Sequence, residues 1–280
     1  MSKEILSLKA KPTTIPHILE IIQEHEGDID QIKREVVQYL QQESIRKKKP
    51  SERILFYAVT IPSLRKLQLL KGEGANIGLS PNGRILVDTY HSSGINGFKK
   101  EFAYLLINID MENGNTINVL QKNSPISIND LANKINSNDN ATLDRLRRWL
   151  NYLKFVDLIK FENNQVILRV SQLKACLEKK NLQFDEHEFI EILLAEYRLI
   201  RHENKGLIYA PIPLIRDRIC ERFSDRGMWT WDFDKRLFAL PRETDTYIIQ
   251  FTQPMERKEG GILNGNRYYY YLHIHEKGNS

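Results

Sequence analysis

A short stretch near the middle of the chain carries side chains suited to binding a polyanion. The leucines at 143, 146, 150 and 153 recur at helical spacing and mark one face of a predicted helix. The side chains off this leucine stripe are Arg145, Arg147, Arg148, Asn151 and Lys154. Arginine can pair with guanine and asparagine with adenine through two hydrogen bonds. Arginine and lysine, the two cationic residue types of the stretch, also bind phosphate. The stretch predicts nucleic-acid contacts, unless these residues only solvate an amphipathic helix.

Two further basic clusters are candidates for phosphate contacts. The run Arg46, Lys47, Lys48 and Lys49 has the highest local positive charge, although a solvated loop would have the same composition. Lys235 and Arg236 lie in a predicted helix over 230–239. Trp229 and Trp231 stand beside them, and two tryptophans this close are expected to bury against a neighbouring domain rather than to contact DNA. Trp149 is likewise expected in a core.

Motifs for catalysis are weak. Two tripeptides, starting at Glu178 and Glu256, match the Glu-x-Lys pattern of metal-dependent nucleases, but neither falls on a predicted strand. His273 and His275 share one face of a predicted strand without a third metal ligand nearby, so we expect exposed edge histidines. The chain has no glycine-rich phosphate loop and no nucleophile elbow. We therefore predict no catalytic residue, no metal and no cofactor.

The composition is that of an ordinary globular protein. The chain is 41% hydrophobic and 28% charged, and its length of 280 residues favours two or three domains. No apolar run approaches the roughly 20 residues of a transmembrane helix, and charges interrupt the N-terminus, so we expect a cytoplasmic protein. Cys176 and Cys220 are far apart in the sequence and are expected to be buried hydrophobes.

The net charge is +5, and its distribution is uneven. Residues 1–100 hold 16 basic and 11 acidic side chains, whereas residues 101–170 hold 8 of each and residues 171–280 hold 17 of each. This mild excess permits nucleic-acid binding without requiring it. The surplus lies entirely in the N-terminal region.

The first hundred residues read as helices followed by a turn and a short strand. At Thr13, Thr14 and Pro16, a threonine cap followed by proline in the first turn predicts a helix start. Gly27 and Asp28 end that helix, and Asp28 or Asp30 is the predicted cap of the next. A third apolar segment covers 51–59. The stretch 64–87 predicts a helix end, a polar turn, a short strand and a new helix starting near Ser80.

The middle region repeats this order more clearly. We predict a helix over 98–109, an apolar segment over 116–120 and a capped short helix over 127–135. A second helix starts at Asp139 or Thr142. Strands over 158–161 and 166–170 flank a polar hairpin tip.

The third region begins with residues 171–180 and a long helix over 185–202. Helices over 212–223 and 230–239 follow, and then strands over 248–251 and 268–274. The stretch 256–266 between these strands is charged and contains glycine, which predicts a long, mobile wing.

This order of helix, short helix, turn, helix and hairpin resembles the winged helix-turn-helix family of DNA-binding proteins. Two segments carry the resemblance. In the first, residues 64–86, a leucine-rich helix end leads to a strand and then to Leu79, Ser80, Gly83 and Arg84, which match the helix start found in the family. The second is residues 126–168. The resemblance implies one helix for the major groove and one hairpin for the adjacent backbone or minor groove.

The combined prediction is a mostly α protein with small β-wings (α+β). It has tandem winged-helix domains at 1–97, 98–170 and 171–280, the last with a long wing. The expected partner is double-stranded DNA, in transcriptional regulation or in plasmid, phage or restriction-related systems. The first alternative is a protein-interaction scaffold within a larger nucleoprotein complex. Its partners would be other proteins or further copies of the same chain. The second is a metal-dependent nuclease, which would need Asp157, Glu178 and Lys180, or the two histidines and a carboxylate, to converge in a pocket.

Overall fold

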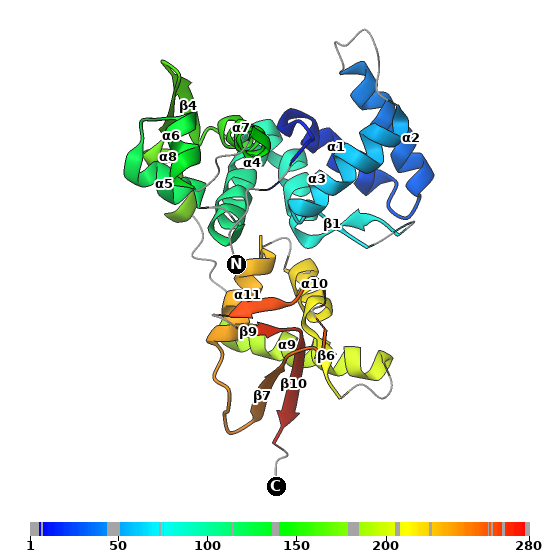
Figure 1. Ribbon diagram of the computed structural model, residues 1–280. Coiled ribbons are helices and arrows are strands. Elements are labelled where there is room, and N and C mark those ends of the chain that lie inside the picture. Colours follow the sequence, from blue (N-terminus) through cyan, green and yellow to red (C-terminus); the bar gives the residue numbers. More distant parts are fainter. Residues whose placement is uncertain are drawn as a thin grey trace. The chain divides into compact units, whose positions relative to one another are not determined.

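The chain forms two compact units, residues 1–181 and 182–280, which are described separately (Figure 1). The computed structural model describes residue 6 and residues 8–277, except 44–50, 73, 75, 114, 136–139, 179–184, 205–207, 224–225, 257, 259 and 265–266. The described chain taken as a whole is mostly helical, and both units carry small antiparallel sheets, as the sequence predicted. Within the described residues, no helix combines the length and apolarity needed to cross a membrane.

The first unit opens with short helices and a two-stranded ribbon. Its elements up to residue 79 are η1 (Pro12–Thr14), α1 (Ile15–Glu24), α2 (Ile29–Gln42), the π-helix η2 (Ile54–Thr60), α3 (Ile61–Lys66), β1 (Leu70–Lys71) and β2 (Gly78–Leu79). Asp28 caps α2 as predicted, because its carboxylate accepts from the backbone N–H of Gln31 at 3.0 Å. The predicted threonine cap of α1 is wrong, since the Thr14 hydroxyl instead donates to the Lys11 carbonyl.

The long helix α4 (Pro81–Asn113) joins the N-terminal and middle segments. Gly94 interrupts it with a φ of 63°, a left-handed conformation that glycine adopts without a side-chain clash. The predicted helix over 98–109 is therefore the second half of a longer element. The expected domain boundary at 97/98 lies inside α4, three residues after the interruption, and the division into three domains stays a prediction.

The contacts at the start of α4 explain why the short motif around Ser80 has these residue types. The Ser80 hydroxyl accepts from the Gly83 N–H at 3.1 Å and donates to the Gln68 carbonyl at 2.6 Å. A Cβ on Gly83 would lie 2.4 Å from the Leu69 carbonyl oxygen, so only glycine lets the helix approach β1 this closely. The guanidinium of Arg84 pairs with Glu26 at 2.6 Å. The motif thus holds the ribbon β1–β2 against the start of α4.

The middle segment combines short helices with a three-stranded sheet. It contains α5 (Thr116–Asn123), β3 (Ile126–Ser127), α6 (Ile128–Lys134), α7 (Asn140–Phe155), β4 (Ile159–Glu162), β5 (Gln165–Leu168) and α8 (Val170–Glu178). The sheet order is β3-β5-β4, and all pairs are antiparallel. Ser127 caps α6 as predicted. The apolar segment at 116–120 proves to be the helix α5.

A buried carboxylate ties three helices of this segment together. Asp110, near the end of α4, accepts a hydrogen bond from the backbone N–H of Ile117 in α5 at 2.8 Å. It also accepts one from the indole nitrogen of Trp149 in α7 at 3.1 Å. Burial raises the pKa of the Asp110 carboxyl above its ordinary value, and the hydrogen bonds partly offset that rise. The core position expected for Trp149 is confirmed.

The second unit has an order of elements similar to that of the middle segment of the first unit. Its helices and strands are α9 (Glu186–Glu203), β6 (Ala210–Pro211), α10 (Ile212–Arg222), α11 (Thr230–Ala239), β7 (Tyr247–Thr252), β8 (Ile262–Asn264), β9 (Arg267–Tyr269) and β10 (Tyr271–Glu276). Strands β6, β10 and β7 form one sheet in that order, while β8 pairs with β9. The predicted strand over 268–274 is therefore two strands. The stretch expected as a mobile wing includes the paired strand β8.

Replacing Gly83 by alanine should destabilise the first unit. The new methyl group would be forced against the Leu69 carbonyl, and we expect the free energy of unfolding to fall by about 1–3 kcal/mol. Urea unfolding followed by circular dichroism measures the change. Ser92→Ala, at an exposed position of the same helix, is the matched control and should change stability little. Equal stability of the two variants would contradict the close approach.

The raised pKa of Asp110 gives a signed dependence of stability on pH. Because the folded chain binds this proton more tightly than the unfolded chain, the contribution is present below the ordinary pKa of 3.8 and is lost as the pH rises through the folded pKa. We expect the free energy of unfolding of the wild type, minus that of Asp110→Asn, to fall as the pH is raised from about 4. Urea titrations over a pH series measure this difference. A difference that stays constant or grows would contradict the assignment.

Candidate nucleic-acid interface

Helix α7 is anchored on one side by apolar packing and by two hydrogen bonds. Leu146, Leu150 and Leu153 are fully buried, as the leucine stripe predicted. Trp149 is buried beside them through its bond to Asp110. Tyr152 packs against Phe102 of α4 and donates its hydroxyl hydrogen to the Ala10 carbonyl at 2.8 Å. These contacts fix which side of α7 is left open.

The open side carries four of the predicted contact residues. Arg147, Arg148, Asn151 and Lys154 are all exposed. At 3.6 residues per turn, Asn151 and Lys154 lie within about 40° of Arg147 around the helix axis, and Arg148 lies about 100° away. Arg147 approaches Asp144 at 3.5 Å, but both side chains are more than half exposed, so this pair is weak. Across the residues that are described, Arg148 and Asn151 form no ion pair or hydrogen bond through their side chains.

Arg145 differs from the other four in its surroundings. A two-residue step places it about 200° around the axis from Arg147, although it lies only about 60° from Arg148. Its side chain is half-buried and already interacts within the chain. The structure therefore brings together four of the five predicted residues of this helix.

The hairpin β4–β5 projects beside α7 and is joined to it (Figure 1). Its two-residue turn is Asn163 and Asn164, with φ values of 49° and 59°, a turn in which asparagine is favoured. The ammonium of Lys154 lies 5.5 Å above the centre of the Phe161 ring in β4. Lys160 pairs with Glu162 along the strand, which lowers the pKa of that carboxyl. Lys154, on the open side of α7, thus contacts Phe161 near the tip of the hairpin.

The other two predicted basic clusters add few exposed cations to the candidate interface among the described residues. Lys235 in α11 is exposed, whereas Arg236 is half-buried and interacts within the chain. Trp229 and Trp231 are buried and stack with ring centres 4.8 Å apart, which confirms their burial, while their packing against a neighbouring domain stays a prediction. The run Arg46, Lys47, Lys48 and Lys49 lies outside the described residues, and its phosphate contacts stay a prediction.

The candidate catalytic groups do not assemble among the described residues. Asp157 pairs with Lys99 and Arg169, while Lys180 lies outside the described residues. His273 is near Gln250 and Tyr209, and His275 is exposed. The part of the chain that is described has one potential metal cluster, Glu24, His25 and Glu35, which sequence reasoning missed. His25 and Glu35 already pair at 3.0 Å near the surface, so this cluster is explained without a metal.

Comparisons of this chain with protein-family models, with curated proteins and with solved structures find no match.

Proposed function

We propose that the chain is a double-stranded DNA-binding protein made of winged-helix units in series. The observation that carries the proposal is the open side of α7, where Arg147, Arg148, Asn151 and Lys154 lie together next to a projecting hairpin. Two arginines and a lysine offer phosphate contacts, and arginine and asparagine can also read base edges in the major groove. We assign α7 to the groove and β4–β5 to the neighbouring backbone.

The connectivity of the elements supports this assignment. The middle segment runs helix α5, strand β3, helices α6 and α7, and strands β4 and β5, and the last strand is central in the sheet. The second unit runs helix α9, strand β6, helices α10 and α11, and strands β7 and β10, again with the last strand central, and the separate pair β8–β9 lies between β7 and β10 in the sequence. In the N-terminal segment, the α-helices α1, α2 and α3 and the π-helix η2 precede the ribbon β1–β2. Each order is one that a winged-helix unit would have.

The two units that share this connectivity differ in charge. Helix α11 exposes Lys235, but it also carries Asp232 and Asp234, and Asp234 pairs with Arg216 at 2.8 Å. Helix α7 exposes two arginines, a lysine and an asparagine. Because phosphate contacts supply most of the non-specific affinity, we assign the main DNA contact to the first unit. The second unit is then available for a protein partner or for self-association. Transcriptional regulation, or a role in a plasmid, phage or restriction system in the cytoplasm, would fit such a protein.

Charge reversal on the open side of α7 should weaken DNA binding. For Arg147→Glu with Arg148→Glu, we expect the affinity for a duplex fragment to fall by about 10- to 100-fold. The slope of log affinity against log salt should become shallower by about 2, because two phosphate contacts are lost. Fluorescence anisotropy with random and genomic duplexes over a salt series measures both quantities.

The matched control makes the same charge change elsewhere in the first unit. Lys122→Glu with Lys174→Glu alters exposed lysines of α5 and α8, and it should reduce affinity much less. Circular dichroism should show both double variants folded. Equal affinity of the α7 variant and the wild type would reject α7 as the interface and would favour a protein-interaction scaffold.

A further inference from the structure

The open side of α7 has two edges, and different parts of the first unit border them. Around the helix axis, the residues follow in the order Lys154, Arg147, Asn151, Arg148 and then the anchored Tyr152. Lys154 marks the edge on the side of the hairpin, where its ammonium lies over the Phe161 ring of β4. Arg148 marks the other edge, about 40° around the axis from Tyr152. A molecule bound on the open side would meet a different part of the chain at each edge.

The N-terminal segment, residues 8–11, borders the edge marked by Arg148. Tyr152 of α7 donates its hydroxyl hydrogen to the Ala10 carbonyl at 2.8 Å. The Ser63 hydroxyl of α3 accepts from the backbone N–H groups of Lys9 at 2.9 Å and of Ala10 at 3.1 Å. The 3-10 helix η1 follows directly and packs against α7 (Figure 1). The segment is therefore fixed beside α7 by its backbone, which leaves its side chains available for other contacts.

This segment presents two lysines to solvent. Leu8 is fully buried and Ala10 is half-buried, whereas Lys9 and Lys11 are exposed. Lys11 has extended backbone angles, with a φ of −79° and a ψ of 133°, and in an extended chain residues two apart point to the same side. Among the residues that the structure describes, neither ammonium group forms an ion pair. The segment thus offers two positive charges on the side that faces away from its buried leucine.

Lys11 lies close to the Arg148 edge of α7. The carbonyl group of Ala10 is bonded to the backbone nitrogen of Lys11, so the Lys11 backbone begins next to the Tyr152 hydroxyl. Arg148 precedes Tyr152 by one helical turn, about 6 Å along the axis. Lysine and arginine both have long side chains that keep their charged ends in water. The two charges can therefore act on neighbouring parts of one bound polyanion.

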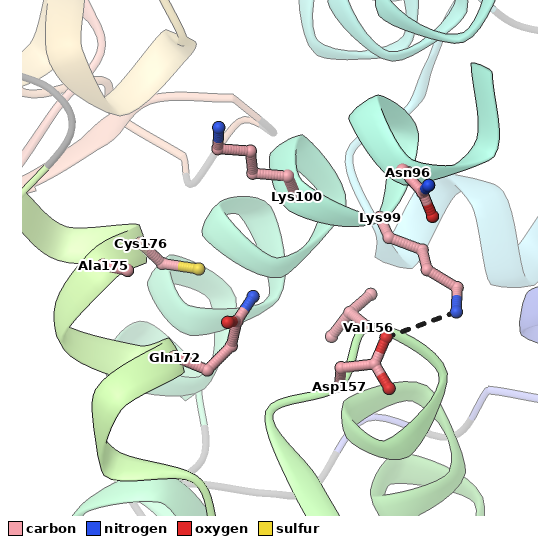
Figure 2. A pocket seen from close by; sticks show the side chains of 8 residues that line it. All are labelled: Asn96, Lys99, Lys100, Val156, Asp157, Gln172, Ala175 and Cys176. Atoms are coloured by element: carbon pink, nitrogen blue, oxygen red, sulfur yellow. Dashed lines mark hydrogen bonds and ion pairs between the residues drawn. The ribbon is translucent and has the colours of Figure 1, made fainter. Parts of the chain in front are cut away.

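A helix in the major groove of DNA has a sugar–phosphate backbone on each side. The groove is about 12 Å wide, close to the roughly 10–12 Å diameter of a helix with its side chains. With α7 in the groove, the hairpin meets the backbone at the Lys154 edge, and residues 8–11 meet the backbone at the Arg148 edge. The hairpin is held in place at its base, because Lys99 of α4 bonds to Asp157, in the turn between α7 and β4, at 3.3 Å beside a surface pocket (Figure 2).

We propose that Lys9 and Lys11 bind the second backbone, so that the first unit contacts both strands that border one major groove. The inference rests on the proposed DNA-binding function of α7, and it identifies the substrate of that site as intact B-form duplex DNA. A single strand has no second backbone across a groove. The major groove of duplex RNA is too narrow and deep for side chains to read.

The contribution of the two lysines is measured on the full chain with Lys9→Gln and Lys11→Gln combined. We expect the affinity for a random-sequence duplex of about 20 base pairs to fall about tenfold, with a salt slope shallower by about 2, because two phosphate contacts are lost. Fluorescence anisotropy over a salt series measures both quantities. Both side chains are exposed, and the backbone N–H groups that bond to Ser63 remain, so circular dichroism should show an unchanged fold.

The matched control removes the same charge elsewhere in the first unit. Lys122→Gln with Lys174→Gln changes exposed lysines of α5 and α8, and it should lower duplex affinity by no more than about twofold. Equal losses in the two double variants would show a general effect of net charge and would overturn the inference.

One strand of the same duplex, tested alone, separates a second-backbone contact from general attraction. We expect the Lys9/Lys11 variant to lose no more than about twofold in affinity for this single strand, against about tenfold for the duplex. Equal losses on the two probes would overturn the second-backbone contact. If the Lys9/Lys11 variant binds the duplex as the wild type does, while Arg147→Glu with Arg148→Glu weakens binding, this inference fails and the proposed function stands. If the wild type does not bind the duplex, both fail.

Discussion

The hydrogen bond from the Trp149 indole to the buried Asp110 carboxylate is the contact on which the proposed interface depends. It ties α7 to the end of α4, and the second oxygen of the same carboxylate accepts from the start of α5. Once Trp149 and the leucines face inward, Arg147 and its neighbours must face solvent, because the helical repeat fixes their angular positions. Burying a carboxylate is costly, and its hydrogen bonds offset part of that cost. The orientation of the helix therefore follows from a polar interaction as well as from apolar burial.

Much of the local structure could be predicted from the sequence because it depends on short-range signals. The leucine stripe located α7, Ser127 and Asp28 capped their helices as expected, and the polar residues 162–165 marked the hairpin. The expectation that the two cysteines are buried is also confirmed. These features arise from periodicity, from capping and from turn preferences, which act over a few residues.

The features that the sequence could not provide depend on contacts between distant residues. Asp110 and Trp149 are 39 residues apart, and Lys99 and Asp157 are 58 apart, so no periodic pattern connects either pair. Helix α5 has only eight residues, and its apolar positions are equally compatible with a strand. Arg145 and Arg147 both lie off the leucine stripe, so the sequence does not distinguish them. In three dimensions Arg145 is half-buried and lies about 200° around the axis from Arg147.

The most direct measurement of the central claim is an NMR titration of the wild-type chain with a short DNA duplex, following the side-chain N–H signals of Arg147, Arg148 and Asn151. The proposal requires these signals to shift and saturate together, while the indole signal of Trp149 stays close to its position in the free protein. Saturating shifts confined to other parts of the chain, with the three α7 signals unmoved, would contradict it.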